Sequence, residues 1–306
     1  MLVRKPAVAG MFYPAEKSAL NSQIKGFFQK IPGKKMEGLP RILIVPHAGY
    51  EYSGQVAAYG FAQLKDANYS TVILLGPTHQ ANFLGAVIDE ADAWETALGK
   101  ISLEKNLAKR IVESDSRVSF SSQSHQREHC LEVEIPFLQT VLPKFKIVPI
   151  LLGQIDDDFV EKLAEVLVKN VNSSTLLVIS TDLSHYPPYE VAETVDRTTI
   201  ESVLSGDVEK FRETIAAQMA KDYPGLDTCA CGQNAVEVAM LLARKLGFED
   251  IRLLNYANSG NTTGEKGRVV GYASIGWYEK NSELTLKAQK KLLEIARETL
   301  ESFLKK

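Results

Sequence analysis

Short apolar runs alternate with amphipathic segments along most of this chain. Near-continuous apolar stretches occupy residues 41–45, 71–76, 146–153 and 176–181. Such runs are typical of strands that are buried on both faces of a sheet. Apolar residues recur at helical spacing at about 54–65, 103–113, 156–169, 189–204, 207–218 and 233–246. This alternation predicts an α/β fold with a central, largely parallel mixed β-sheet flanked by helices.

The last part of the pattern differs from the rest. Residues 251–257 and 268–278 read as two closing strands joined by the Gly- and Asn-rich stretch NSGNTTGEKG, and we expect them to form an antiparallel pair. From residue 279 onward the chain is polar, free of glycine and helical in period. We therefore predict one α/β domain over 1–278, followed by a linker and an extra C-terminal helix over 279–306.

Composition narrows the possible partners. The 306 residues are 45% hydrophobic, which is enough for a large core. A net charge of −3 and a pI near 6.0 give no basic excess, so we expect no nucleic-acid partner. No apolar run approaches the roughly 20 residues of a membrane span, and we expect a cytoplasmic protein without a membrane partner. Three cysteines, an odd number, indicate free thiols or metal ligands rather than a disulfide framework.

Polar side chains follow three of the predicted strands. His47 comes just after the first, His79 after the second, and Asp182 and His185 after the run LLVIST. A single histidine after a strand is often a loop residue with one hydrogen bond. In a parallel sheet, however, the carboxyl ends of the strands share one edge, where ligands bind. The repetition therefore predicts that these four side chains converge in one pocket.

A thiol is a further candidate ligand. Cys231 precedes a strongly periodic helical segment, and the positive end of a helix dipole favours the thiolate that metals bind. Cys229 lies two residues earlier and is an alternative ligand. A small buried thiol that packs under the helix is the plainer explanation for either cysteine.

A second histidine pair occurs in the stretch SHQREHCLEVE. His125 and His129 stand four residues apart, with Glu128 between them, a spacing that places two imidazoles on one face of a helix. The segment runs into Pro136 and an apolar stripe. We therefore expect a packed helix with polar residues near the cleft wall rather than a metal-binding pair.

Several motifs together resemble a known family. The stretches AGMFYP (9–14), PHAGYEYSG (46–54), GPTHQ (76–80), EHCLEVEIPFLQ (128–139), STDLSHY (180–186), CGQNAV (231–236) and LNYANSG (254–260) are similar to those of the Memo family, the middle component of the AmmeMemoRadiSam set. The resemblance covers nearly all of residues 1–278. It implies a fold like that of class III extradiol dioxygenases, which are non-haem iron enzymes. It also implies an AMMECR-like domain and a radical SAM protein as partners.

The resemblance also implies site residues. The metal-associated positions of the family fall on His47, His79 and Cys231, with Asp182 and His185 beside them. Glu132 matches a motif position and is expected to line the cleft. Four tyrosines beside the cleft, Tyr13, Tyr50, Tyr52 and Tyr186, are candidates for binding an aromatic or peptide ligand, although such tyrosines are commonly packing residues.

The ligand types leave the metal open. Two imidazoles with one anionic ligand suit non-haem Fe(II), and with a thiolate they also suit Cu or Zn. The related dioxygenases use a carboxylate where this chain has Cys231, which argues against extradiol ring cleavage. Asp182 either supplies a hard oxygen ligand or orients a ligating histidine. His185 is a candidate general acid or base.

These residues support a metal-dependent oxidoreductase that uses Fe or Cu. The alternatives are a non-catalytic protein that binds a peptide or partner in the same cleft, and a zinc-type hydrolase. The apolar stripe in residues 283–306 resembles the first helix of an AMMECR family domain. We therefore expect the chain to be the front portion, or a relic, of a longer fusion.

Overall fold

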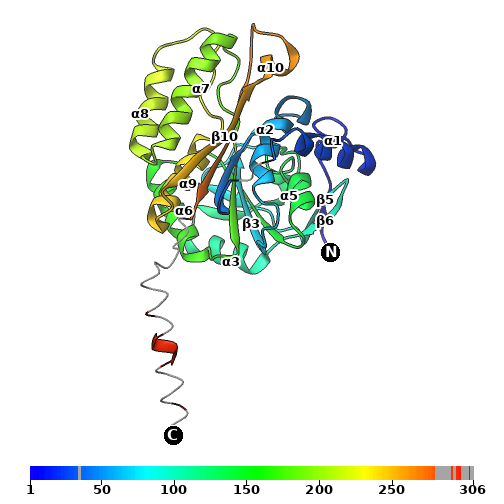
Figure 1. Cartoon of the computed structure of the whole chain (residues 1–306), viewed down its shortest axis with the longest axis vertical. Helices are drawn as coiled ribbons and strands as arrows, with labels where there is room; N and C mark the ends of the chain where they lie inside the picture. Colours follow the sequence, from blue (N-terminus) through cyan, green and yellow to red (C-terminus); the bar gives the residue numbers. More distant parts are fainter. Residues whose placement is uncertain (34–35, 280–290, 292–293, 298–302, 304–306) are drawn as a thin grey trace.

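The computed structural model has an eight-stranded sheet at its centre, with helices on both faces (Figure 1). It describes residues 1–33, 36–279, 291, 294–297 and 303. The strand order is β10-β11-β2-β9-β3-β8-β4-β7. The four central strands are parallel to one another; they are β2 (Pro40–Val45), β9 (Thr175–Ser180), β3 (Thr71–Pro77) and β8 (Lys146–Leu152). These strands correspond to the four apolar runs, so the predicted α/β architecture is confirmed.

The outer strands make the sheet mixed. β10 (Asp250–Asn258) and β11 (Gly271–Tyr278) form the predicted antiparallel pair, and β11 continues antiparallel onto β2. The stretch between them contains a short helix, α10 (Ser259–Thr263), where the sequence indicated a loop. At the other edge, β4 (Ala86–Ile88) is antiparallel to β8 and parallel to β7 (Val118–Phe120).

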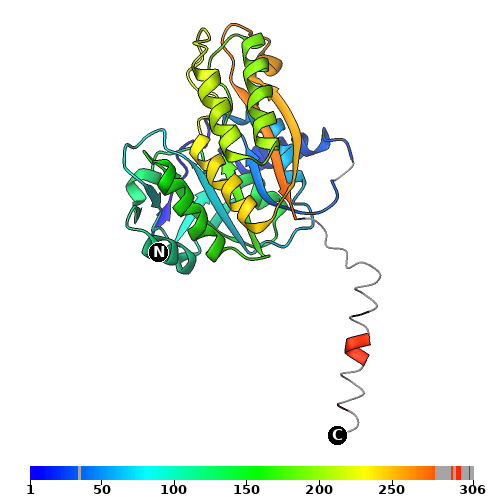
Figure 2. The ribbon, with the colours of Figure 1, turned by 90° about the vertical axis from the view of Figure 1, so that its left-hand side faces the viewer.

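Each face of the sheet carries its own core, because successive side chains of a strand point to opposite faces. Ile42 and Ile44 of β2 face one core, while Leu43 and Val45 face the other. The first core contains residues of α3 (Lys105–Ser114), α6 (Asp157–Asn170), α7 (Tyr189–Leu204), α8 (Val208–Met219) and α9 (Gln233–Leu246). The second contains residues of α1 (Lys17–Gln29), α2 (Tyr50–Ala62) and α5 (Ile135–Val141). In Figure 2, α7 stands beside the long strand β10, and α8 packs against α7 on the side away from β10.

A second, smaller sheet holds the N-terminal end of the chain. Strand β1 (Val3–Arg4) pairs in parallel with β5 (Ala93–Thr96), and β5 pairs with β6 (Gly99–Ser102). Sequence periodicity did not predict these strands, because two to four residues are too few to show an alternation. This sheet brings the first residues of the chain beside the segment that follows α4 (Ser122–His125).

The described part of the chain contains no helix with the length and apolarity needed to cross a membrane. The extra C-terminal helix expected over 283–306 falls largely outside the described residues, and its resemblance to an AMMECR family domain stays a prediction.

Candidate metal centre

Three neighbouring strands each end two residues before a polar side chain. His47 follows the end of β2, Asp182 the end of β9, and His79 the end of β3. Because these strands are adjacent and parallel in the order β2-β9-β3, the three side chains meet at one edge of the sheet. The ring centroids of His47 and His79 are 5.1 Å apart.

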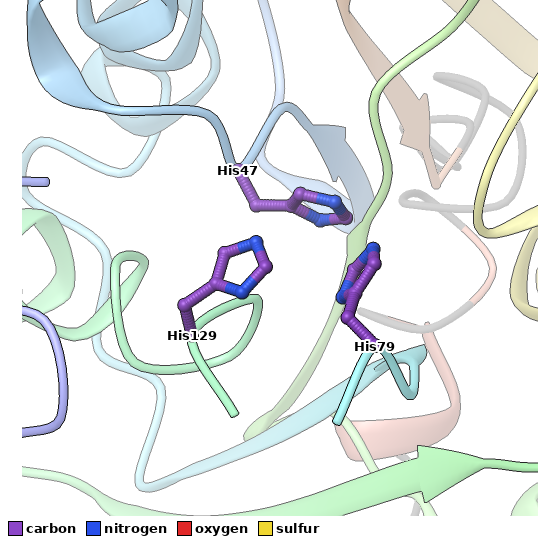
Figure 3. Close-up of side chains that lie close together, drawn as sticks. All are labelled: His47, His79 and His129. Atoms are coloured by element: carbon purple, nitrogen blue, oxygen red, sulfur yellow. The ribbon is translucent and has the colours of Figure 1, made fainter. Parts of the chain in front are cut away.

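A third imidazole completes the cluster. His129 lies in the turns between α4 and α5, and its ring centroid is 4.6 Å from that of His79 and 5.4 Å from that of His47 (Figure 3). One ring nitrogen from each of the three histidines lies within 4.8 Å of the other two. Three convergent imidazole nitrogens suit Zn, Cu, Fe or Ni.

The outer nitrogen of each ring already has a hydrogen-bond partner. Glu128 Oε1 is 2.9 Å from His79 Nδ1 and 3.2 Å from His129 Nδ1. The Ser180 hydroxyl donates to Cys130 O at 2.7 Å and so accepts from His47 Nδ1 at 2.8 Å. All three Nδ1 atoms therefore act as donors, which makes each Nε2 the acceptor nitrogen, the one that can bind a metal ion.

The charges in the centre also suit a cation. Burial, followed by the nearby His79 and His129, holds the pKa of His47 well below its usual value, so its ring is neutral. Burial opposes ionisation of Glu128, but hydrogen bonds from His129 and His79 outweigh it and lower the pKa of this carboxyl far below its usual range. The centre thus combines the neutral imidazole of His47 with one buried negative charge.

Cys231 lies on the His47 side of the cluster. Its Sγ is 3.3 Å from His47 Nε2 and accepts a hydrogen bond from Asp182 N at 3.3 Å. Burial, followed by the charge of Asp182, raises the pKa of Cys231 to about 12. In the metal-free protein, burial thus opposes the thiolate that the N-terminus of α9 is expected to favour. Cys229 is buried away from this contact, with its Sγ 3.6 Å from Met219 Sδ.

Asp182 and His185 complete the polar surroundings. Asp182 Oδ1 accepts the backbone N–H of His47 at 2.8 Å, and burial raises the pKa of Asp182 to about 7. His185 Nε2 is buried and has no hydrogen-bond partner among the described residues. Burial, followed by the nearby His79, lowers the pKa of His185. Asp182 can therefore carry or release a proton close to neutral pH, whereas His185 loses its proton at a lower pH than usual.

Comparison with known proteins assigns the family. The family model described as "Memo-like protein" matches residues 4–276. The chain belongs to the Memo-like family. Its relatives include a MEMO1 family protein of Caldivirga maquilingensis, 35% identical over 290 residues, with 91% of this chain and 100% of the relative covered. MEMO1 family protein TV1383 of Thermoplasma volcanium is 33% identical over 275 residues, with 90% and 98% covered.

A solved structure gives a weaker likeness. The uncharacterized protein JW3007 from Escherichia coli K12 has a TM-score of 0.48 and 13% sequence identity, and the match covers 76% of this chain and 98% of that one. A structural similarity this low says nothing about the site of this Memo-like chain.

Two cavities adjoin the centre of the Memo-like fold. The larger, with a volume of about 1020 Å³, is lined by His129, Gln80 and residues 2–8 of the N-terminal segment, among others. The smaller, about 490 Å³, is lined by Cys231 and the start of α9. The first is large enough for a drug-sized molecule and borders the cluster at His129.

The proposed substrate-binding residues are placed differently from one another. Glu132 is fully buried, and its two oxygens accept hydrogen bonds from Arg4, Ala7 N, Val8 N and Tyr13. Tyr50 is also buried and donates to Val133 O at 2.6 Å. The polar atoms of Tyr13, Tyr50 and Glu132 thus have internal partners. Tyr186, by contrast, is 39% exposed and lies in an open cavity with Tyr52 and Arg268. A role in substrate binding stays a prediction for all of these residues.

His125 and His129, the two histidines of the stretch SHQREHCLEVE, have different surroundings. His125 is buried against Trp94, with ring centroids 5.6 Å apart, and its Nε2 lies 3.2 Å from Val87 O. The expected packed helix is wrong, because α4 ends at His125 and turns follow it up to α5. Because the chain leaves helix α4 after His125, His129 lies in the histidine cluster. The sequence did not predict this position. The sequence signal for His129 was the Glu-His dipeptide within a family motif. The helical spacing of His125 and His129 favoured a different interpretation, a packed helix.

Proposed function

We propose that this Memo-like protein is a metal-dependent oxidoreductase whose centre binds Fe or Cu through His47, His79 and His129, with Cys231 as a fourth donor. The observation that carries the proposal is the convergence of three ring nitrogens within 4.8 Å. Glu128 and Ser180 support it, because they occupy Nδ1 of each ring and make Nε2 the nitrogen that can bind a metal ion.

The spacing of His47 and Cys231 fits a shared ion. Two donors bound to one metal at about 2.0–2.3 Å lie about 3–4 Å apart, and His47 Nε2 and Cys231 Sγ are 3.3 Å apart. Imidazole with thiolate suits Cu, Fe and Zn. When bound, a redox-active ion would supply a Lewis acid and an electron-transfer centre. The resemblance of the family to non-haem dioxygenases favours Fe or Cu over Zn.

The protein itself contributes proton handling. Asp182, whose pKa lies at about 7, is present in both protonation states near neutral pH. It can take a proton from a bound substrate or return one. His185 lies close enough to His79 for the two to influence each other electrostatically, and its unpaired Nε2 can accept a proton. These two groups are our candidates for general acid and base.

Metal analysis with an oxygen-uptake assay tests the proposal. Protein purified without added chelator is analysed for Fe, Cu and Zn, and oxygen uptake is measured with ascorbate as electron donor. We expect one Fe or Cu per chain and uptake above that of a His47→Ala/His79→Ala variant at equal total metal. Zinc alone, or uptake equal to that of the variant, would contradict the oxidoreductase proposal.

A further inference from the structure

A buried arginine at the start of the chain contacts the segment that carries His129. Arg4 belongs to the two-residue strand β1 and is 7% exposed. Its guanidinium lies over the ring of Trp94, with Cζ 4.1 Å from the ring centroid. Burying an arginine costs free energy unless its N–H donors form hydrogen bonds. The partners in these hydrogen bonds therefore indicate the role of Arg4.

Among the described residues, the hydrogen bonds of the Arg4 side chain all end on residues 125–132. Nε donates to His125 O at 2.8 Å, and Nη2 donates to Glu128 O at 2.6 Å. Nη1 donates to Glu132 Oε2 at 2.6 Å, an ion pair in which both side chains are almost fully buried. The rigid, planar fork of an arginine can bind three such points at once, which a lysine cannot do.

The contacted segment has little regular structure of its own. Residues 126–134 form turns with a few local bonds, such as Glu128 N to His125 O at 3.2 Å and Val133 N to His129 O at 3.1 Å. Without a helix or strand ladder, its backbone position depends on contacts from elsewhere in the fold. From near the N-terminus, Arg4 supplies one of them at Glu128 O and adds contacts to the Glu132 carboxylate and to His125 O at the start of the segment.

Glu128 links these contacts to the histidines. Its backbone oxygen accepts from Arg4, while its carboxylate accepts from His79 N at 2.6 Å and from His129 N at 3.0 Å. The same carboxylate also contacts the Nδ1 atoms of both rings. A shift of the Glu128 backbone would therefore turn two of the three imidazoles at once.

We propose that Arg4 is a positioning residue of the metal centre, which holds Glu128 and His129 where the Nε2 atoms of His79 and His129 converge. This proposal rests on the metal site proposed above. It assigns to the first strand of the chain a role that its position in the sequence, 125 residues before His129, does not suggest. Outer partners of metal ligands typically contribute about 10–100-fold to metal affinity.

The test compares three variants in metal binding, with cobalt(II) as the probe because its visible spectrum reports ligand geometry. Arg4→Gln should bind cobalt(II) about 10–100-fold more weakly than wild type and with an altered spectrum. Arg4→Lys, which keeps the charge but not the planar fork, should bind cobalt(II) with an affinity between those of wild type and Arg4→Gln.

Arg41→Met is the control. Arg41 binds Glu279 and Asn172 O and stacks on Phe248 at the opposite end of β2, so its loss should leave affinity and spectrum unchanged.

A second measurement decides the matter without any metal. In metal-free protein with ¹⁵N-labelled histidine, the ring nitrogen shifts of His79 and His129 report which nitrogen is protonated. We expect both rings of Arg4→Gln to lose the single Nδ1–H form, while His47, held by Ser180, keeps it. Unchanged ring signals in Arg4→Gln would overturn the positioning role and leave Arg4 as a structural anchor. If wild type binds no cobalt(II), the proposed function fails, and the ring signals still decide the role of Arg4.

Discussion

Replacing Glu128 by glutamine keeps the size of the side chain but removes its charge and half of its acceptor capacity. In the structure the two carboxylate oxygens face five donors: His79 N and Nδ1, His129 N and Nδ1, and Cys130 N. A carboxamide has one acceptor oxygen, and its NH₂ group would face a donor. Both Nδ1 atoms contact Oε1, whereas His79 N contacts Oε2, so an NH₂ group in either position faces a donor of His79 and must displace this residue.

The size of the effect follows from the number of ligands involved. Loss of one outer partner weakens metal binding about 10–100-fold, and because two ligands share Glu128 we expect the upper end, about 100-fold or about 2.7 kcal/mol. Calorimetric titration with cobalt(II), in competition with a chelator, measures the change.

The matched control for Glu128→Gln is Asp89→Asn. Asp89 is also a buried carboxylate, which accepts from Ala91 N at 2.9 Å, Trp94 Nε1 at 2.6 Å and the Ser122 hydroxyl. It does not touch the three histidines, so its variant should bind cobalt(II) as wild type does. Equal affinities for Glu128→Gln and wild type would refute the view that this carboxylate sets the rings.

Three further predictions concern protons and packing. Burial lowers the pKa of His125 from 6.5 to about 4. As the pH falls from about 6.5 towards about 4, the unfolded chain therefore binds a proton before the folded protein does. The free energy of unfolding then decreases, by about 2 kcal/mol at about pH 5. In urea unfolding, His125→Phe should remove that share of the loss, whereas an unchanged pH dependence would show that His125 does not titrate in this way. If Cys231 is a ligand, metal binding at neutral pH should release one proton more per ion from wild type than from Cys231→Ser, because the thiol, with a pKa of about 12, must lose its proton to bind. Cys229→Ser should match wild type, in calorimetry repeated in buffers of different ionisation enthalpy. Gly271→Ala should cost about 3 kcal/mol of unfolding free energy, because its Cβ would lie 2.0 Å from the buried Asp196 Oδ2; a melting temperature equal to that of wild type would contradict this.

The central strands and most of the helices could be predicted because their signal is local. The apolar runs at 41–45, 71–76, 146–153 and 176–181 became β2, β3, β8 and β9, and the order of strands and helices implied parallel pairing. Short elements such as β1 and β7 have too few residues for a periodic pattern, and only their partners in the folded chain make them strands.

The site was predictable only where it follows from strand ends. His47, His79 and Asp182 meet because β2, β3 and β9 are parallel neighbours, which a sequence can indicate. His129 reaches the same place from a turn held by Arg4, and no local pattern encodes a contact between residues so far apart in sequence. The protonated state of Cys231 depends on its burial, which likewise arises only in the folded chain.

The most direct test of the three-imidazole centre is a metal titration of two histidine variants from the same segment. His129→Ala removes an imidazole from the cluster, while His125→Phe removes one that lies only four residues away against Trp94. Our account predicts that His129→Ala binds cobalt(II) at least about 100-fold more weakly than wild type, and that His125→Phe binds it equally well. Wild-type affinity in His129→Ala would contradict the three-imidazole centre.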